Sequence, residues 1–166
     1  PSAVDQVLAQ IRELIVVGGL KVGDRLPTER ELCERFSSSR TTVREAMRQD
    51  NLDAILVSGA RGSSEVHYLS NYLAQSPCWL LFPREGVPTV FIHFFNHQPC
   101  AKAQSIITDV RWYGPAPVPT LADAIRQRNL AKSRIGLVSK RAMAYGHVTE
   151  LQRLFPEARV DWSREG

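Results

Sequence analysis

The segment 21–48 constrains the fold of this chain more than any other part of its sequence. Within it, Thr28 and Glu31 have the spacing of a capping box, in which the Thr hydroxyl accepts a free backbone N–H and the Glu side chain reaches back. A glycine and a proline precede this pair as turn residues. The pattern therefore predicts a turn and then a helix that ends near Phe36.

Three consecutive serines, 37–39, follow this helix and are predicted to interrupt it. Ser39 is also a good N-cap for a second helix. The side chains expected near the start of that second helix are Arg40, Thr41, Thr42 and Arg44. Two short helices joined by a tight turn form a helix-turn-helix, in which the start of the second helix meets base edges in the major groove. Arginine suits this position because it bonds guanine with two hydrogen bonds and keeps its charge. The alternative is an arginine-rich, solvated helix pair with no role on DNA.

This segment resembles the DNA-binding domain of GntR-family transcription regulators. The family hallmark is G-D-x-L-P-[ST]-E-R-x-L, a short turn, and S-R-x-T-V-R-x-A, and the matching stretches here are 23–32 and 39–46. The resemblance implies that the DNA contacts are Arg30, Arg40, Thr42 and Arg44, with Thr41 as an addition. The family usually has a glycine and a small apolar residue in the turn where this chain has two serines. A two-stranded wing follows the second helix in the family, but no hairpin signal follows it here.

From residue 51 onward, short apolar runs alternate with amphipathic segments. The predicted strands are 54–57, 79–82, 89–95, 106–113, 134–138 and 158–162. The predicted helices are 63–73, 97–104, 145–155 and one that Thr120 caps, in addition to an amphipathic helix over 3–17 at the start of the chain. The segment 83–88 predicts a hairpin turn, and the three prolines in 114–119 predict a surface loop. We therefore expect an α/β fold: a small three-helix head over 1–48, then a mixed sheet flanked by helices over 49–166.

The second part of the chain is similar to the N-terminal domain of the creatinase and prolidase group, which includes X-Pro aminopeptidases. The motifs L-D-A-[IL]-L-V, V-x-Y-L, L-L-F-P-x-x-G-x-P, R-I-G-L and L-x-x-x-[LF]-P-x-A-x-x-x-D occur in that order over 51–162. In that family this domain is non-catalytic, helps to form the dimer and shapes the substrate pocket. The resemblance implies no cofactor and no metal in this chain, and two divalent metal ions only if a peptidase domain follows.

The family commonly has an arginine before Tyr-Leu that reaches the substrate of a neighbouring subunit. Here His67 occupies that position, ahead of Tyr68, and the two are the candidate pocket residues. A protonated His67 could bind an acidic group, whereas a surface or helix-packing histidine is the alternative. The other three histidines, His93, His97 and His147, lie on separate predicted elements without ligand spacing, so we expect them to be structural.

The segment 44–57 satisfies a creatinase-type pattern, R-x-A-M-R-x-x-x-L-D-A-[IL]-L-V, and the same residues finish the recognition helix of the GntR resemblance. This overlap leads to the hypothesis that one helix ends the DNA-binding head and begins the α/β domain. A break in that helix between Thr42 and Asp50 would contradict the hypothesis.

Composition limits the function further. The net charge of +4 is small, so any affinity for DNA has to come from the placement of charges. No stretch approaches the ~20 apolar residues that span a membrane, and the N-terminus lacks a signal pattern, so we expect a cytoplasmic protein. Three cysteines without a Cys-x-x-Cys spacing indicate neither a disulfide framework nor a zinc site.

Two classes of function follow from these observations. The first is a DNA-binding transcription regulator of GntR type, acting as a homodimer, whose second domain serves dimerisation and senses a small peptide or amide. It could form the front part of a regulator–peptidase fusion. The alternative is the non-catalytic N-terminal part of a metal-dependent X-Pro aminopeptidase or dipeptidase, or a plain interaction module. In each case we expect no enzymatic activity from this chain alone.

Overall fold

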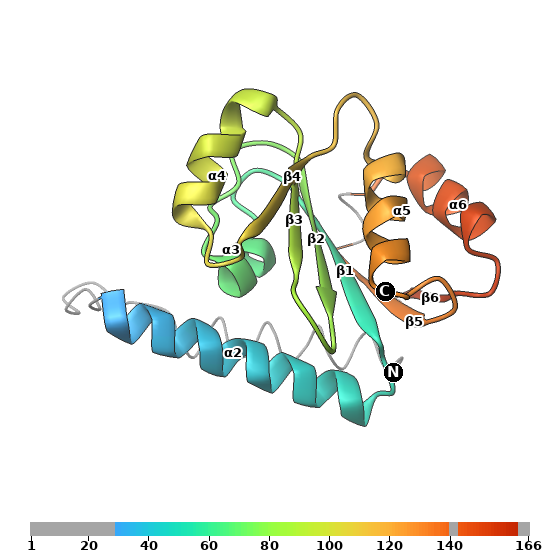
Figure 1. Cartoon of the computed structure of the whole chain (residues 1–166), viewed down its shortest axis with the longest axis horizontal. Coiled ribbons are helices and arrows are strands. Elements are labelled where there is room, and N and C mark those ends of the chain that lie inside the picture. The colour runs from blue at the N-terminus through green and yellow to red at the C-terminus, as the bar shows by residue number, and fades with distance from the viewer. Residues whose placement is uncertain (1–28, 140–142, 163–166) are drawn as a thin grey trace.

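The computed structural model describes residues 29–139 and 143–162 (Figure 1). Its elements are α2 (Glu29–Gln49), β1 (Ala54–Gly59), α3 (Ser64–Ser70), β2 (Cys78–Pro83), β3 (Thr89–Ile92), the 3-10 helix η1 (Phe95–His97), α4 (Gln98–Gln104), β4 (Asp109–Trp112), α5 (Pro117–Gln127), β5 (Arg134–Val138), α6 (Tyr145–Leu154) and β6 (Arg159–Trp162). The predicted helix 3–17 and the turn before Thr28 lie outside the described residues.

The strands form one six-stranded mixed sheet in the order β4-β3-β2-β1-β5-β6. β2 pairs antiparallel with β1 and β3, whereas the pairs β3–β4, β1–β5 and β5–β6 are parallel. Every strand except β2 therefore runs in the same direction, and their carboxyl ends meet at one edge of the sheet. The predicted mixed sheet and the predicted hairpin between β2 and β3 are both confirmed.

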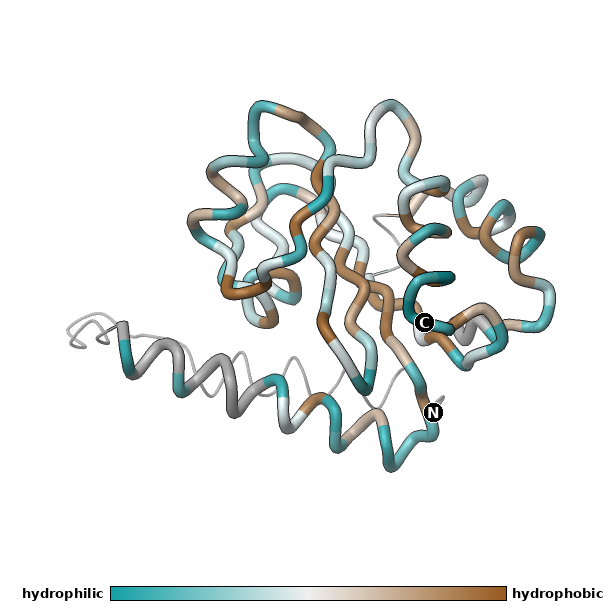
Figure 2. Tube along the Cα trace, viewed as in Figure 1, coloured by the Kyte–Doolittle hydropathy of each residue, from teal (hydrophilic) through white to brown (hydrophobic). Residues whose placement is uncertain are grey.

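Two helical layers cover the sheet. Alternate residues of β1 point to opposite faces, so Ile55 and Val57 join a core with α2, α3 and α4, whereas Leu56 joins a core with α5 and α6. All six residues of β1 are buried, as are all six of β2, because both central strands are covered on both faces. Figure 2 shows the corresponding concentration of hydrophobic residues along the central strands.

The second half of α2 belongs to the core of the α/β domain. Val43, Ala46 and Met47 recur at the spacing of one helical face, and each is at most 3% exposed. They pack in the same cluster as Leu69 and Tyr72 from the region of α3. The other half of α2 extends past the sheet at the bottom of Figure 1.

The predicted turn at Ser37–Ser39 is wrong, because α2 is helical from Glu29 to Gln49 without interruption. Serine in a helix interior costs only a fraction of a kcal/mol relative to alanine, and the segment contains neither glycine nor proline. The buried face of the second half then favours continuation of the helix. The helix α2 has no break from Thr42 to its end at Gln49, as the hypothesis of one shared helix requires.

Two further boundaries differ from the prediction. The predicted loop 114–119 ends early, because Pro117 is the first residue of α5 and Pro119 lies within its first turn. Proline is favourable there, since its fixed φ suits a helix and its missing N–H would have had no partner in the first turn. The predicted helix 63–73 ends at Ser70, where Asn71 adopts a left-handed conformation with φ of 61° and caps it.

A half-buried charge cluster fixes the edge strand β4 to the rest of the sheet. The carboxylate of Asp109 accepts hydrogen bonds from Thr89, Arg111 and Arg128, with Oδ2 2.7 Å from Thr89 Oγ1 and 2.8 Å from an Nη2 atom of each arginine. Burial acts to raise the pKa of Asp109, but these hydrogen bonds outweigh it and lower the pKa to about 2. Asp109 therefore stabilises the fold above the pKa of an unfolded Asp, about 3.9, and the stabilisation is lost as the pH falls towards 2.

We predict that Asp109→Asn weakens the acid sensitivity of the fold. Between about pH 4 and pH 2, the free energy of unfolding of the wild type falls more steeply than that of Asp109→Asn, measured by urea unfolding at each pH. Asp123→Asn is the matched control, because Asp123 forms only an exposed ion pair with Arg126. Parallel slopes for all three proteins would contradict the role given to Asp109.

We also predict that Met47→Ala destabilises the α/β domain by about 2–5 kcal/mol, because Met47 is fully buried in its core. Urea unfolding followed by circular dichroism measures this change. Glu34→Ala, on the exposed part of the same helix, is expected to change stability by less than about 0.5 kcal/mol. Equal effects would mean that α2 is an appendage of the domain.

Candidate nucleic-acid interface

The predicted DNA contacts lie along one continuous helix. Arg30, Thr41 and Thr42 are exposed, whereas Arg40 and Arg44 are half-buried. Val43, which lies between Thr42 and Arg44, belongs to the apolar face of α2 that packs against the α/β domain. The second half of the helix thus combines a polar surface with an apolar face anchored in the α/β domain.

Arg30 is one of the exposed residues among the predicted contacts. Its Nε atom lies 3.0 Å from Oε1 of Glu34, one helical turn further on, and its side chain is 87% exposed. An exposed ion pair of this kind contributes at most about 1 kcal/mol, because water screens both charges. The guanidinium can therefore exchange Glu34 for a phosphate at little cost.

Arg40 lies one helical turn before Arg44, so the two guanidinium groups repel each other. Burial and then the charge of Arg44 lower the pKa of Arg40. An arginine remains charged at neutral pH even so. A negatively charged partner at this position would relieve the repulsion, which is what a DNA phosphate provides.

Arg44, unlike Arg30, contacts residues outside its own helix. Its Nη2 atom donates a hydrogen bond of 2.8 Å to the backbone oxygen of Gly86, and its Cζ atom lies 5.3 Å from the centre of the Phe82 ring. Its Nε atom is buried and has no partner among the described residues. One turn further on, Arg48 forms ion pairs with Glu45 and Glu85 at 3.2 and 3.0 Å. Both arginines therefore tie α2 to the turn between β2 and β3.

The predicted pocket residues lie on α3, on the same side of the sheet as α2. Ser63 caps this helix by accepting a hydrogen bond from the backbone N–H of Val66. His67 is exposed, whereas Tyr68 is buried in the core. The structure therefore places these neighbours in different surroundings, and only His67 is accessible to a ligand.

Two histidines predicted to be structural come together with aromatic side chains at the carboxyl edge of the sheet. His93 follows β3 and His147 lies in the first turn of α6, and both line one hollow with Trp79 and Tyr113. Sequence spacing could not reveal this group, because its members come from four separate elements. The sequence held one indication of this group. Each of the four residues lies at or near an end of its predicted element, and these ends meet at the carboxyl edge of the sheet.

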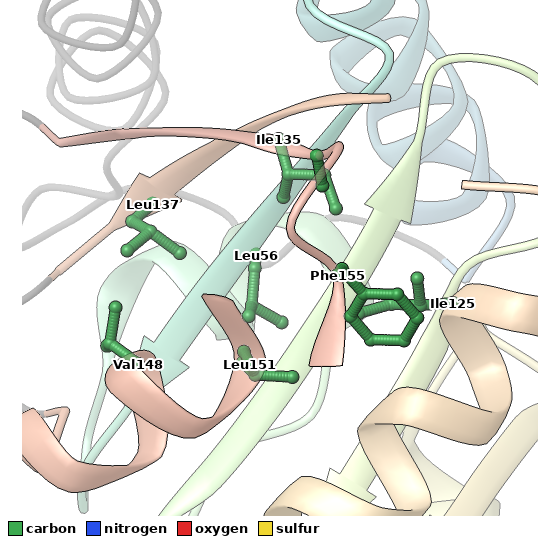
Figure 3. Close-up of a pocket in the computed structure, with 8 residues that line it drawn as sticks. Leu56, Ile125, Ile135, Leu137, Val148, Leu151 and Phe155 are labelled. Atoms are coloured by element: carbon green, nitrogen blue, oxygen red, sulfur yellow. The ribbon is translucent and has the colours of Figure 1, made fainter. Parts of the chain in front are cut away.

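A second cavity is a gap in the core. Figure 3 shows apolar side chains that converge on it from the sheet and from α5 and α6, among them Leu56, Ile125, Leu151 and Phe155. Its volume of about 10 Å³ is close to the minimum that holds one water molecule, and an apolar cavity does not attract one. The gap is therefore too small for a ligand.

The described residues contain no group of three or more His, Cys, Asp or Glu side chains that could hold a metal ion. Cys78 is buried, and burial raises the pKa of its thiol to about 12, so it stays protonated at neutral pH. Among the helices that the structure describes, none is long and apolar enough to cross a membrane.

The fold is that of an α/β domain. Its helix α2 also carries the arginine-rich motif that resembles a DNA-binding segment. Residues 40–163 match the model of the creatinase/prolidase N-terminal domain, and residues 3–66 match that of the bacterial regulatory proteins of the gntR family. Because the first match spans more than half of the chain, the chain belongs to the creatinase/prolidase N-terminal domain family. The two matches overlap over 40–66, the region that contains the second half of α2.

Curated relatives with similar sequences are transcription regulators that match part of this chain. The chain is 54% identical over 44 residues to the mannosyl-D-glycerate transport/metabolism system repressor of Escherichia coli K12, a match over 26% of this chain and 18% of that protein. It is 33% identical over 93 residues to the Glc operon transcriptional activator of the same strain, over 56% of this chain and 32% of that protein. The chain thus spans less than a third of the length of these curated relatives.

Solved structures with a similar fold superpose on most of this chain. An Xaa-Pro aminopeptidase from Streptococcus pyogenes superposes with a TM-score of 0.63 and 12% identity, over 79% of this chain and 93% of that chain. The creatinase/prolidase-like N-terminal domain of a metallopeptidase from Corynebacterium diphtheriae gives a TM-score of 0.59 and 14% identity, over 76% and 94%. At such identities these likenesses establish the fold alone.

We predict that Arg44→Ala destabilises the α/β domain on the order of 1–3 kcal/mol, because it removes a charged hydrogen bond and a cation–π contact. Arg48→Ala removes the same charge from the same helix but only exposed ion pairs, so we expect little change. Urea unfolding midpoints of the two variants measure the difference. Equal midpoints would show that the contact with Phe82 and Gly86 contributes nothing.

Proposed function

We propose that this chain is a DNA-binding transcription regulator of GntR type whose second domain is a non-catalytic creatinase-like domain. The observation that carries the proposal is the overlap of the two family matches on α2. This helix bears the Ser-Arg-x-Thr-Val-Arg motif on a segment whose apolar face is buried in the α/β domain. A DNA-contacting helix whose apolar face is buried in the second domain would move together with that domain.

The proposed DNA contacts are Arg30, Arg40, Thr41, Thr42 and Arg44. The exposure of Arg30, Thr41 and Thr42 supports a surface that a duplex could reach, and the strained Arg40–Arg44 pair supports an anionic partner. Arginine and threonine are suited to phosphates and base edges. Arg44 would have to contact DNA while it holds Gly86, or exchange one partner for the other.

The proposed assembly is a homodimer that acts in the cytoplasm. Regulators of this kind bind two half-sites about one helical turn apart, so they need a second domain that pairs two copies. The creatinase-like domain is the proposed dimerisation unit. His67, exposed on α3, is its proposed contact with a small acidic peptide or amide.

A second candidate function is favoured by the fold alone. The likeness to peptidase N-terminal domains supports a role for 40–163 as the non-catalytic front part of a metal-dependent X-Pro aminopeptidase or dipeptidase. In that case a further domain would supply the ligands of two divalent metal ions. Hydrolysis of X-Pro dipeptides by the complete gene product with manganese or cobalt would favour this candidate, and we expect none from residues 1–166 alone.

We predict that the chain binds random duplex DNA with a steep dependence on salt, and that Arg30→Ala combined with Arg40→Ala flattens it. Each lost phosphate contact lowers the slope of log K against log salt by about 0.9. Fluorescence anisotropy at several salt concentrations measures this slope. Arg44 is left intact because its loss would also disturb the fold.

The matched control is Lys132→Ala combined with Arg153→Ala, which removes the same total charge from exposed positions near β5 and on α6. It should retain the wild-type slope. If both double variants lower the slope equally, the affinity for DNA reflects net charge alone and α2 is not the DNA-binding element. If neither changes it, the proposed contact set is wrong.

A further inference from the structure

The hollow at the carboxyl edge of the sheet is not used by the proposed DNA contacts or by His67. Its cavity volume is about 230 Å³, and Trp79, His93, Tyr113 and His147 line it. In open α/β sheets, ligands bind in the crevice outside the carboxyl ends of the strands. Five of the six strands end at this edge, and Figure 1 shows the loop from β4 to α5 rising beyond it. The hollow therefore lies where this architecture favours binding.

The two imidazole rings are positioned by aromatic contacts. His147 lies edge-on to Trp79 with ring centres 5.9 Å apart, and His93 lies 5.4 Å from the ring of Tyr113. Nδ1 of each imidazole is buried without a hydrogen-bond partner in the described chain. A structural histidine would normally have such a partner. If the proton of each neutral imidazole is on Nε2, Nδ1 is the unprotonated nitrogen. Nε2–H of each ring can then donate one hydrogen bond to a ligand.

The electrostatic surroundings favour an anion. α5 and α6 both begin at the hollow, where Pro117 and Ala144 contribute to its lining, and neither helix has a side-chain N-cap. The positive ends of both helix dipoles therefore lie beside it. Burial raises the pKa of Tyr113 to about 12, so its phenol stays neutral. None of the residues that line the hollow is Asp or Glu.

The remaining lining is apolar and rigid. Trp79, Tyr113 and three prolines, two of them Pro115 and Pro117, offer flat surfaces for a ring or a short branched chain. Pockets for drug-sized ligands measure about 300–1,000 Å³. This hollow is smaller, and its volume of about 230 Å³ suits a molecule of amino-acid size.

From these features we infer that the hollow binds a small organic acid. The carboxylate accepts hydrogen bonds from Nε2–H of His93 and His147 near the start of α6, and the apolar body packs on Trp79 and Tyr113. This site is separate from His67, which lies on α3 on the other side of the sheet. The inference does not depend on DNA binding, so the two proposals can fail independently.

Nuclear magnetic resonance of the histidine rings tests this inference directly, because the chain has only four histidines. Phenylacetate and isobutyrate are titrated into the isotopically labelled protein, each beside its neutral amide as the matched control. We expect at least one acid at millimolar concentration to shift the ring signals of His93 and His147. The amide of that acid should bind about tenfold more weakly or worse.

Two variants test the role of the imidazoles. His147→Phe and His93→Phe keep a flat ring but remove the N–H donor, and each should weaken binding of the acid about tenfold. Arg153→Ala, at an exposed position on the same helix as His147, is the control with unchanged affinity, and thermal unfolding confirms that each variant is folded. The inference is overturned if neither acid shifts the two ring signals, if the amides bind as well as the acids, or if both folded variants bind like the wild type.

Discussion

The apolar face of α2 is the contact on which the organisation of this chain depends. Val43, Ala46 and Met47 bury against the sheet and α3, so the helix cannot leave the α/β domain without exposing a continuous part of its core. The same helix carries the residues that resemble a DNA reader. A movement of this part of α2 is therefore coupled to the α/β domain through their shared core.

Much of the fold followed from the sequence, because its signals are local. The apolar runs predicted the strands β1, β2 and β5, and the turn residues between β2 and β3 predicted their pairing. The error at Ser37–Ser39 arose because a capping residue favours a helix start only weakly. Packing of Val43 and Met47 several residues later favours an uninterrupted helix.

The candidate sites were less predictable than the fold. Arg30 and Arg40 could be named from a linear motif, but the contact of Arg44 with Phe82 and Gly86 spans some forty positions and depends on the pairing of strands. The same limit applies to the hollow at the carboxyl edge. His93 and His147 become neighbours of one cavity only through the order of the sheet, which no spacing rule encodes.

The antiparallel strand β2 has a consequence for how this protein can vary. Its residues alternate between faces, so Phe82 meets Arg44 at one end while Trp79 lines the hollow at the other end and on the opposite face. A slip of one residue against β1 or β3 would invert both orientations together. Variation along this strand is thus confined to substitutions that preserve length and alternation, and inserted residues can be accommodated only outside it, as in the turn beyond Pro83.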